Sequence, residues 1–486
     1  MKIHRLVLTL FGLAILSFAQ DSADRLIAEA LKPSPIDKNL EVLTDQIGGR
    51  VPGTPAMQKA VQWGVAAFKA AGADSVHTED FTIQSSWAEG NTQMSVSTPE
   101  SFSLRVVSLA WAPALGPQRH VAVVDVGSGS AEDFAKAGDI SGKILLIHSS
   151  EMSTWDDLFA EYLRAPGIID RAVKGKAMAV AFQSTRPHDL LYRHSNSIAG
   201  EIDRLPMVLV AREDAARVAR LIASGQEVFA DISIPNRIGG AITTSNVIAE
   251  LKGSEKPDEF VVLGAHLDSW ELGTGALDNG CNAALAIDAL RAIKVEGMRP
   301  KRSIRFILFS GEEQGLLGSH AYVRKHRDEL DRAAGVVILD EGIGQVTGFS
   351  LGGRKDIVQT ITNIVAPLKQ FDATILTTDA EWGTDHFDFM LEGVPTLFAN
   401  QREGNYLINY HAMSDTYDKV DLAELKKHVA IAATVTFGIA NAEGRIGPRL
   451  TRAQIEQTMR ETHLDDLMKT FGMWDDWEQR KLGRSE

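Results

Sequence analysis

Two adjacent acids stand in the stretch FILFSGEEQGLLGS, at residues 306–319. Glu312 and Glu313 follow an apolar run and lie between Gly311 and Gly315. Neighbouring carboxylates repel each other, and near an apolar strand each resists ionisation unless a cation offsets the charge. A metal site explains the pair, and a solvated turn is the ordinary alternative, because charged residues are mostly exposed. The rest of the chain has to decide between the two.

Histidines and further acids follow other predicted strands. They are His266, Asp268 and Asp278 after EFVVLGA, Asp340 after AGVVIL, and His411 in NYHAMSDTYDKVD. In open α/β sheets ligands bind beyond the carboxyl ends of the strands, so we expect these side chains and the two glutamates to meet at one edge. Taken alone, each of these residues could have a purely structural role, as a surface histidine, a helix cap or a turn residue. Four separate segments with such residues favour a common site.

The types of these residues indicate a metal. Two histidines and several carboxylates without a thiol suit zinc or another borderline divalent ion. Five ligands for two ions require one carboxylate to bridge, and Asp278 is the candidate; paired ions typically lie about 3.5–4 Å apart. Asp268 comes two residues after His266 and could orient that imidazole as an acceptor. A solvent-facing turn acid is the alternative for Asp268.

Three further residues are weaker candidates. His386 in GTDHFDF could contact substrate or be a buried structural histidine, and Arg354 in GGRKD could bind a substrate carboxylate or be solvated. Tyr410 precedes His411 and could stabilise an oxyanion.

The candidate site depends on a sheet that the sequence predicts between residues 245 and 442. Apolar runs such as EFVVLGA, SIRFILFSG, AGVVILDEG and VPTLFAN alternate with helical patterns that begin near residues 282, 316, 355 and 421. Near-continuous apolar strands separated by helices indicate an α/β fold, with a mostly parallel mixed sheet covered by helices on both faces.

A second unit interrupts this pattern. From 105 to 237 short β-like runs such as HVAVVDVG, GKILLIH, AMAVAF and PMVLVA follow one another, which predicts a self-contained β-rich insert. We therefore divide the chain into a signal peptide at 1–19, an N-terminal part of the catalytic domain at 20–104, the insert at 105–237, the catalytic domain with the metal ligands at 238–442, and a helical tail at 443–486.

The first residues predict export. Lys2 and Arg5 precede an apolar stretch that ends in small residues, which is the pattern of a signal cut after Ala19. The apolar run is shorter than the roughly 20 residues of a spanning helix, so we expect no stable membrane anchor after cleavage. A secreted or periplasmic location follows.

Composition excludes several functions. The 486 residues are 44% hydrophobic and 23% charged, which is ordinary for a globular protein. Loss of the signal takes away Lys2 and Arg5 and no acid, so the net charge moves from −14 to −16. This charge, and the lack of a basic run with interleaved aromatic residues, argue against a nucleic-acid binder. Cys281 is the only cysteine, which excludes an intramolecular disulfide.

Several motifs resemble one family of enzymes. SNVIAELKGSEKPDEFVVLGAHLDSW, GALDNG, FSGEEQGLLGS and LDEG strongly resemble the co-catalytic zinc exopeptidases, which include many aminopeptidases, and the resemblance extends over roughly residues 45–425. It implies two Zn²⁺ per chain, with these ligands: His266 and Asp340 on one ion, Glu313 and His411 on the other, and Asp278 between them. Glu312 is implied to be the general base, with Asp268 as a second catalytic residue.

The resemblance has further implications. The insert is similar to a protease-associated domain, which in this family lies beside the active-site cleft, and the family implies a homodimer. Because the resembling enzymes bend the chain after the bridging aspartate, we expect a strained, cis bond between Asp278 and Asn279. Asn279 stands where some relatives carry a second acid, and Cys281 where glycine is common.

The sequence therefore predicts an exported dinuclear zinc exopeptidase that hydrolyses short peptides. The motifs are most similar to a member with dipeptidase activity, and a general aminopeptidase is the alternative. Relatives of this fold that lost their metals serve as binding modules, and the intact set of candidate ligands argues against that third reading.

Overall fold

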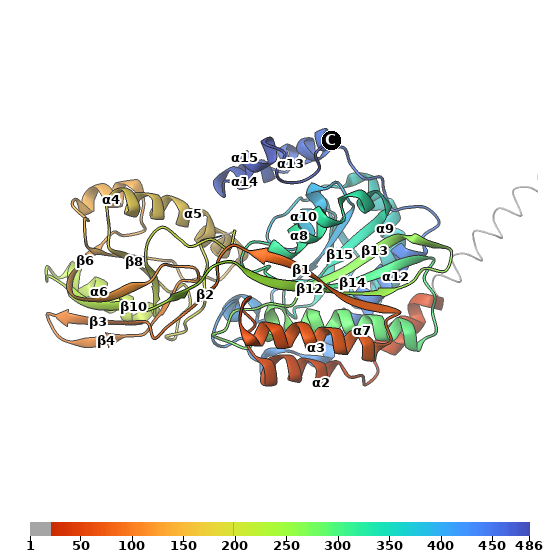
Figure 1. Cartoon of the computed structure of the whole chain (residues 1–486), viewed down its shortest axis with the longest axis horizontal. Coiled ribbons are helices and arrows are strands. Elements are labelled where there is room, and N and C mark those ends of the chain that lie inside the picture. Colours follow the sequence, from red (N-terminus) through yellow and green to blue (C-terminus); the bar gives the residue numbers. More distant parts are fainter. Residues whose placement is uncertain (1–20, 198) are drawn as a thin grey trace, which may run out of the picture.

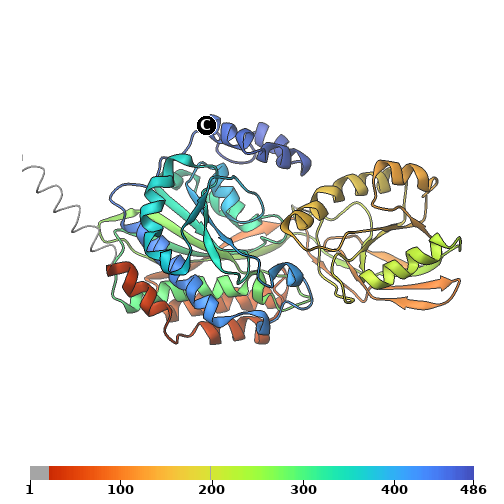
Figure 2. The same cartoon turned by 180° about the vertical axis from the view of Figure 1, so that it is seen from behind.

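The computed structural model describes residues 21–197 and 199–486, so the predicted signal peptide at 1–19 lies outside the described residues. The chain forms two lobes of unequal size joined by a narrow connection (Figure 1), and the view from behind shows the same division (Figure 2). Each lobe is built on a sheet of its own.

The larger lobe contains the predicted mixed sheet. Its strands lie in the order β1 (Ser75–Ile83), β12 (Ile242–Leu251), β14 (Arg302–Phe309), β13 (Lys256–His266), β15 (Ala333–Ile338), β18 (Thr396–Gln401), β16 (Val346–Ser350) and β17 (Ile375–Thr377). The four central strands β14, β13, β15 and β18 are parallel to one another. Antiparallel pairs flank them on both sides. The prediction of a mixed α/β sheet is confirmed.

Helices cover both faces of this sheet. One face packs against α3 (Pro55–Ala71), α7 (Cys281–Val295) and α12 (Leu422–Asn441), and the other against α8 (Leu317–Lys325) and α10 (His386–Leu391). Alternate residues of a strand point to opposite faces. In β13, Val261 and Leu263 therefore pack on the first face while Phe260 and Val262 pack on the second. Burial on both faces explains the near-continuous apolar runs in the sequence.

Local signals set the ends of the helices. The Thr54 side chain accepts a hydrogen bond from the backbone of Met57 at the start of α3, and Pro55 occupies the first helical position. Gly72 ends the helix in a left-handed conformation.

Cys281 is the first residue of α7 and is fully buried, and this burial raises the pKa of its thiol.

The smaller lobe lies between β1 and β12 in the sequence. Its strands lie in the order β4 (Phe102–Leu104), β3 (Gln93–Thr98), β10 (Phe229–Ile234), β6 (Leu115–Asp125), β7 (Ile144–Ile147), β8 (Ala179–Gln183), β9 (Met207–Val210) and β5 (Val106–Ser108). It also carries the helices α4 (Ala131–Ala137), α5 (Trp155–Lys174) and α6 (Arg212–Ala223). We call this lobe the insert.

The structure corrects the predicted start of the insert. Strands β3 and β4 belong to its sheet, so the sheet begins at Gln93 and not at 105. Met94 and Val96 of β3 are buried, and the more exposed Gln93 and Ser95 alternate with them because only one face of this strand packs on the core. Two buried residues in so short a polar stretch give a weak apolar signal.

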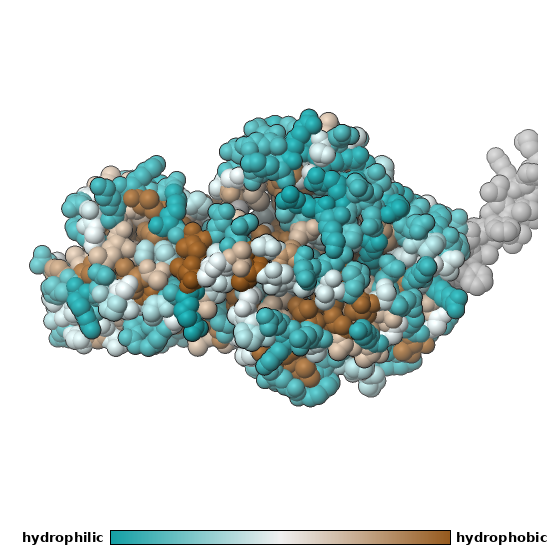
Figure 3. All heavy atoms as spheres, viewed as in Figure 1, coloured by the Kyte–Doolittle hydropathy of each residue, from teal (hydrophilic) through white to brown (hydrophobic). Residues whose placement is uncertain are grey.

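The chain enters and leaves the insert at one place. Strand β2 (Trp87–Ala88) leads out and pairs with β11 (Arg237–Ile238), which leads back. On the face shown in Figure 3, hydrophobic residues reach the surface in the region where the lobes meet, while the C-terminal helices are largely hydrophilic. The predicted tail forms the helices α13 (Arg452–Glu461), α14 (Leu464–Thr470) and α15 (Met473–Glu478).

Candidate metal centre

Three parallel strands deliver the candidate ligands to one edge of the large sheet. β13 ends at His266, which pairs with Phe309 at the end of β14. Glu312 and Glu313 follow three residues later in a tight turn, and Asp340 follows the end of the neighbouring β15. The parallel order explains why side chains so distant in sequence meet at this edge.

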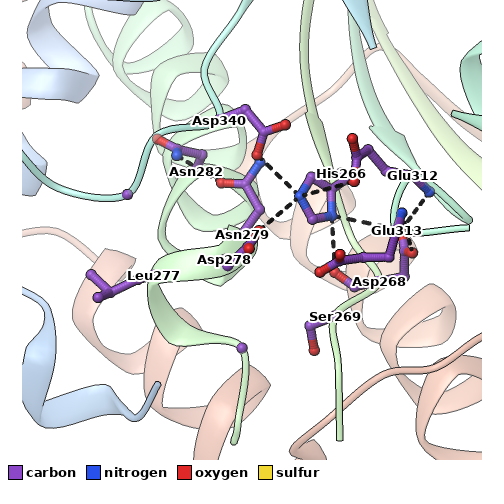
Figure 4. A network of polar contacts seen from close by, with 12 residues as sticks. His266, Asp268, Ser269, Leu277, Asp278, Asn279, Asn282, Glu312, Glu313 and Asp340 are labelled. Atoms are coloured by element: carbon purple, nitrogen blue, oxygen red, sulfur yellow. Dashed lines mark hydrogen bonds and ion pairs between the residues drawn. The ribbon is translucent and has the colours of Figure 1, made fainter. Parts of the chain in front are cut away.

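His266 lies at the centre of the first group (Figure 4). Its Nε2 atom is 3.1 Å from Asp278 Oδ1 and 3.0 Å from Asp340 Oδ1. Glu312 Oε2 lies farther away, at 3.9 Å from the same nitrogen. The Nδ1 atom bonds to the backbone oxygen of Asp268 at 3.0 Å, which leaves Nε2 directed at the carboxylates.

His411 forms the second group. Its Nε2 atom is 2.8 Å from Glu313 Oε2 and 3.4 Å from Asp278 Oδ2. The two oxygens of Asp278 therefore face different histidines, Oδ1 toward His266 and Oδ2 toward His411. This is the placement that a bridging carboxylate needs.

The residues present suit bound cations. Asp278 Oδ2 and Glu313 Oε1 are buried and have no hydrogen-bond partner. Burial, together with the Asp278 carboxylate, raises the pKa of Glu313 well above its ordinary value, and burial raises the pKa of Asp340 to about 6. So many buried carboxyl groups with imidazoles between them form a donor set that zinc favours, and a divalent ion would offset their repulsion.

Glu312 differs from the ligand candidates. Its side chain is 11% exposed, against 2% for Glu313, and it lines a cavity. Burial raises the pKa of Glu312 well above its ordinary value, with Asp340 and Glu313 adding to the effect.

Asp268 contacts His266 and also holds the turn of the two glutamates. Its carboxylate oxygen lies 3.7 Å from His266 Nδ1, too far for a hydrogen bond, and its backbone oxygen orients the imidazole instead. The carboxylate accepts hydrogen bonds from the backbone of Glu312 at 3.2 Å and of Glu313 at 3.3 Å. Asp268 thus holds the turn that carries both glutamates. The chain leaves the extended conformation after His266, so spacing in a strand did not predict this orientation.

A second buried aspartate, which the sequence analysis missed, holds the loop before α7. Asp415 accepts hydrogen bonds from the backbone of Ala276, Leu277 and Asp278 at 3.1, 2.7 and 3.2 Å. The bond between Asp278 and Asn279 is cis, as predicted. Asp415 stands four residues after His411, and this short spacing in an acidic loop was the only signal for it.

Arg50 was also missed. Its guanidinium is fully buried and donates to the backbone oxygens of four residues, Gly48, Leu267, Thr274 and Gly275. These hydrogen bonds hold the loop between His266 and Asp278 in place. A lone arginine in a loop rich in glycine and proline gives no indication of contacts more than 200 residues away.

A cavity of about 410 Å³ opens onto the metal centre. Both lobes line it: the insert contributes Trp155, Leu158, Phe159 and Tyr162 from α5. Of the weaker candidates, His386 and Tyr410 line the cavity, and Tyr410 hydrogen-bonds to Tyr162 of the insert at 2.9 Å. Arg354 is buried outside the cavity lining and pairs with Asp356 at 2.7 Å, so it is neither solvated nor placed for a substrate.

Two acids outside the ligand set also line the cavity. They are Glu341, next to Asp340, and Glu381. Burial raises the pKa of Glu341 to about 8 and that of Glu381 to about 7. No lysine or arginine is among the described residues that line the cavity.

Comparison with known proteins shows which enzymes this chain resembles. Residues 246–436 match peptidase family M28. The chain is 26% identical over 408 residues to carboxypeptidase Q of Rattus norvegicus, which covers 84% of this chain and 85% of the relative. It is 23% identical over 409 residues to a probable leucine aminopeptidase 2 of Aspergillus fumigatus, with coverage of 75% and 76%.

Solved structures agree with this relationship. A peptidase M28 precursor from Shewanella amazonensis superimposes with a TM-score of 0.81 at 26% identity, over 90% of this chain and 100% of that structure. The zinc aminopeptidase BSAP from Bacillus subtilis has the same fold, with a TM-score of 0.66 at 20% identity, over 86% of this chain and 97% of that structure. Residues 246–436 therefore resemble peptidase family M28, and the protein is a zinc-dependent metallopeptidase similar to carboxypeptidase Q.

Proposed function

We propose that the protein is an exopeptidase that hydrolyses short peptides, dipeptides among them, and requires a free amino terminus. The observation that carries this proposal is the set of ionisable side chains that line the cavity. Glu341 and Glu381 offer carboxyl groups, which a bound ammonium group would keep ionised against the effect of burial, while the described lining offers no lysine or arginine to a substrate carboxylate. The volume of about 410 Å³ lies at the small end of the range for ligand sites, about 300–1,000 Å³. A general aminopeptidase with the same requirement is the alternative.

The site residues suggest how two zinc ions are held. We assign His266 and Asp340 to one ion, Glu313 and His411 to the other, and Asp278 to both, because each oxygen of Asp278 faces one histidine. Zinc held by these residues would supply a Lewis acid for the scissile carbonyl group and would lower the pKa of a bound water.

Glu312 then moves the proton. We assign it as the general base because its side chain is the most exposed of the four acids that line the cavity beside the histidines, 11% against 5% or less for the others. Its carboxylate takes a proton from the attacking water as the oxygen bonds to the carbonyl carbon. The same proton passes to the amide nitrogen when the carbon–nitrogen bond breaks, which releases a free amine. Asp268 keeps the turn of Glu312 in place through its two backbone hydrogen bonds.

The insert completes the cavity. We propose that it corresponds to a protease-associated domain, because it lies between β1 and β12 in the chain and its helix α5 forms one wall of the cavity. Trp155, Leu158 and Phe159 make this wall apolar. They exclude water from the reacting groups and favour substrates with apolar side chains on that side.

A panel of substrates tests the requirement for a free amino terminus. We expect dipeptides and aminoacyl amides to be cleaved and N-acetyl dipeptides to resist cleavage, because an acetylated nitrogen carries no charge for the two glutamates. A chelator should abolish every activity, and added zinc should restore it. Cleavage of N-acetyl dipeptides at the rate of the free dipeptides would contradict the proposal.

The variant Glu381→Gln tests whether this side chain binds the ammonium group of the substrate. A hydrogen bond to a charged group contributes about 1.5–3 kcal/mol, so we expect KM for dipeptides to rise by roughly tenfold or more. Zinc content serves as the control and should stay at the wild-type value, because Glu381 lies outside the ligand set.

We also propose that the enzyme acts outside the cytoplasm. The support is the predicted signal at 1–19. As a separate finding, none of the helices that the structure describes is long and apolar enough to cross a membrane. Mass spectrometry of the exported protein should place its first residue at Gln20. An exported chain that still begins at Met1 would sink this idea.

A further inference from the structure

A short segment of the insert lies directly against the loop that carries His411. The backbone of Arg193 donates to the oxygen of His411 at 2.9 Å, and Met413 donates to the oxygen of Leu191 at 3.1 Å. Tyr192 and Ala412 form a β-bridge between these bonds. The loop of His411 is therefore paired with the insert and not with the sheet of its own lobe.

The same segment also contacts the imidazole. His411 Nδ1 lies 3.1 Å from the backbone oxygen of Arg193. With a proton on Nδ1 donated to this oxygen, the lone pair of Nε2 points at Glu313 and Asp278. A hydrogen bond of this kind fixes the tautomer and the direction of a ligating histidine. His266 donates the equivalent bond to the backbone oxygen of Asp268 in its own lobe, whereas His411 donates it to the insert.

The position of the Arg193 carbonyl is set by its own side chain. The guanidinium is fully buried and donates to Glu89 at 2.5 Å, to Glu271 at 2.5 and 3.0 Å, and to the backbone oxygen of Ser108. It also lies over the ring of Trp87, 5.2 Å from the centroid. Glu89 follows β2 and Glu271 belongs to the loop after His266, so one guanidinium ties the insert to the connection and to the metal loop.

We propose that the insert is a working part of the metal centre: the Arg193 carbonyl positions His411, and the contacts of the Arg193 side chain with Glu89 and Glu271 hold that carbonyl in place. Arg193 is a positioning residue that acts through His411. The inference rests on the proposed role of His411 as a metal ligand. It predicts that zinc affinity depends on an ion pair at the junction of the lobes, in which no atom is itself a ligand.

The chain offers a matched control for this ion pair. Glu259 pairs with the fully buried Arg302 at 2.5 Å and is 30% exposed, while Glu271 pairs with Arg193 at the same distance and is 34% exposed. The Arg302 pair lies at the far end of β13, away from the metal centre. Glu271→Gln and Glu259→Gln therefore remove the same charge from equally buried arginines, and only the first should affect His411.

Zinc titration of the metal-free protein against a competing chelator tests the proposal. Loss of a residue that orients a ligand typically weakens metal binding 10–100-fold. We expect Glu89→Gln with Glu271→Gln to weaken one of two zinc affinities by about that factor, and Glu259→Gln to leave both unchanged. If the double variant does not fold, Glu271→Gln alone should weaken the same zinc affinity, but by a smaller factor. Equal affinities in the Glu271 and Glu259 variants would overturn the proposal.

The variant His411→Ala separates this inference from the proposed function. If His411→Ala keeps both zinc affinities, the assigned ligand set is wrong. If His411→Ala loses one site and the Glu271 variants do not, the ligand set stands and the role of the insert fails. Linkage provides a second measurement, because zinc must stabilise the contact that favours its binding. Amide exchange at residues 191–194 should slow when zinc is added, and equal exchange with and without zinc would count against the proposal.

Discussion

Glu312→Gln is expected to retain its full zinc content and its fold but to lose activity by roughly 10²–10⁴-fold, the factor typical of a general base. The amide of glutamine cannot accept the proton of water. The hydrogen bond from the backbone N–H of residue 312 to the Asp268 carboxylate is unaffected by the change, so the turn should stay in place. Turnover of a dipeptide and zinc content per chain are the measurements.

Glu313→Gln is the matched variant, because it changes the adjacent residue in the same way. Glu313 Oε2 lies 2.8 Å from His411 Nε2, and its Oε1 is buried without a partner, so we expect loss of the negative charge to weaken one zinc site. Reduced zinc occupancy should accompany its loss of activity. A fully metallated Glu312→Gln enzyme with near wild-type turnover would falsify the assignment of the base.

Arg50→Met is expected to lower both stability and zinc content. The side chain binds three backbone oxygens in the buried loop that ends at Asp278 and the backbone oxygen of Gly48, and the substitution removes this donor from all four. It also removes a cation from the surroundings of Asp415, Asp268 and Asp278. Removal of one partner from a buried charged network costs about 3–5 kcal/mol of unfolding free energy. Thermal unfolding and zinc analysis of the purified variant would measure both effects.

Arg302→Met controls for the loss of a buried arginine as such. Arg302 is also fully buried and binds Glu259 and the oxygen of Ala442, far from the metal centre. We expect this variant to lose stability and keep its zinc. Arg50→Lys should be intermediate, because one ammonium retains the charge but cannot reach all four oxygens. If Arg50→Met kept both its zinc and its melting temperature, the loop would need another support.

The sequence predicts those parts of the site that depend on strand ends. Continuous apolar runs identified β13, β14 and β15, and the rule that parallel strands end at one edge brought His266, Glu312 and Asp340 together. His411 was found through its own loop and the family resemblance. Sequence-based reasoning succeeds here because each residue follows an element that its own neighbours specify.

Residues that act through tertiary contacts could not be predicted in this way. Arg50 binds Thr274 and Arg193 binds His411, over separations of 224 and 218 residues. Nothing near these arginines in the sequence distinguishes them from solvated ones. Strand β13 ends at His266, so the alternation of a strand could not predict that the Asp268 carboxylate also binds the backbone of the glutamate turn.

The burial of Cys281 at the start of α7 makes this protein convenient for site-specific labelling. The thiolate is the form that reacts with maleimides, and burial both raises the pKa of this thiol and shields it from reagents. Cysteines introduced at exposed positions such as Glu132 in the insert and Lys355 in the large lobe would then be the only reactive thiols. A fluorophore pair at these positions could follow the distance between the lobes during turnover, with no need to remove a native cysteine first.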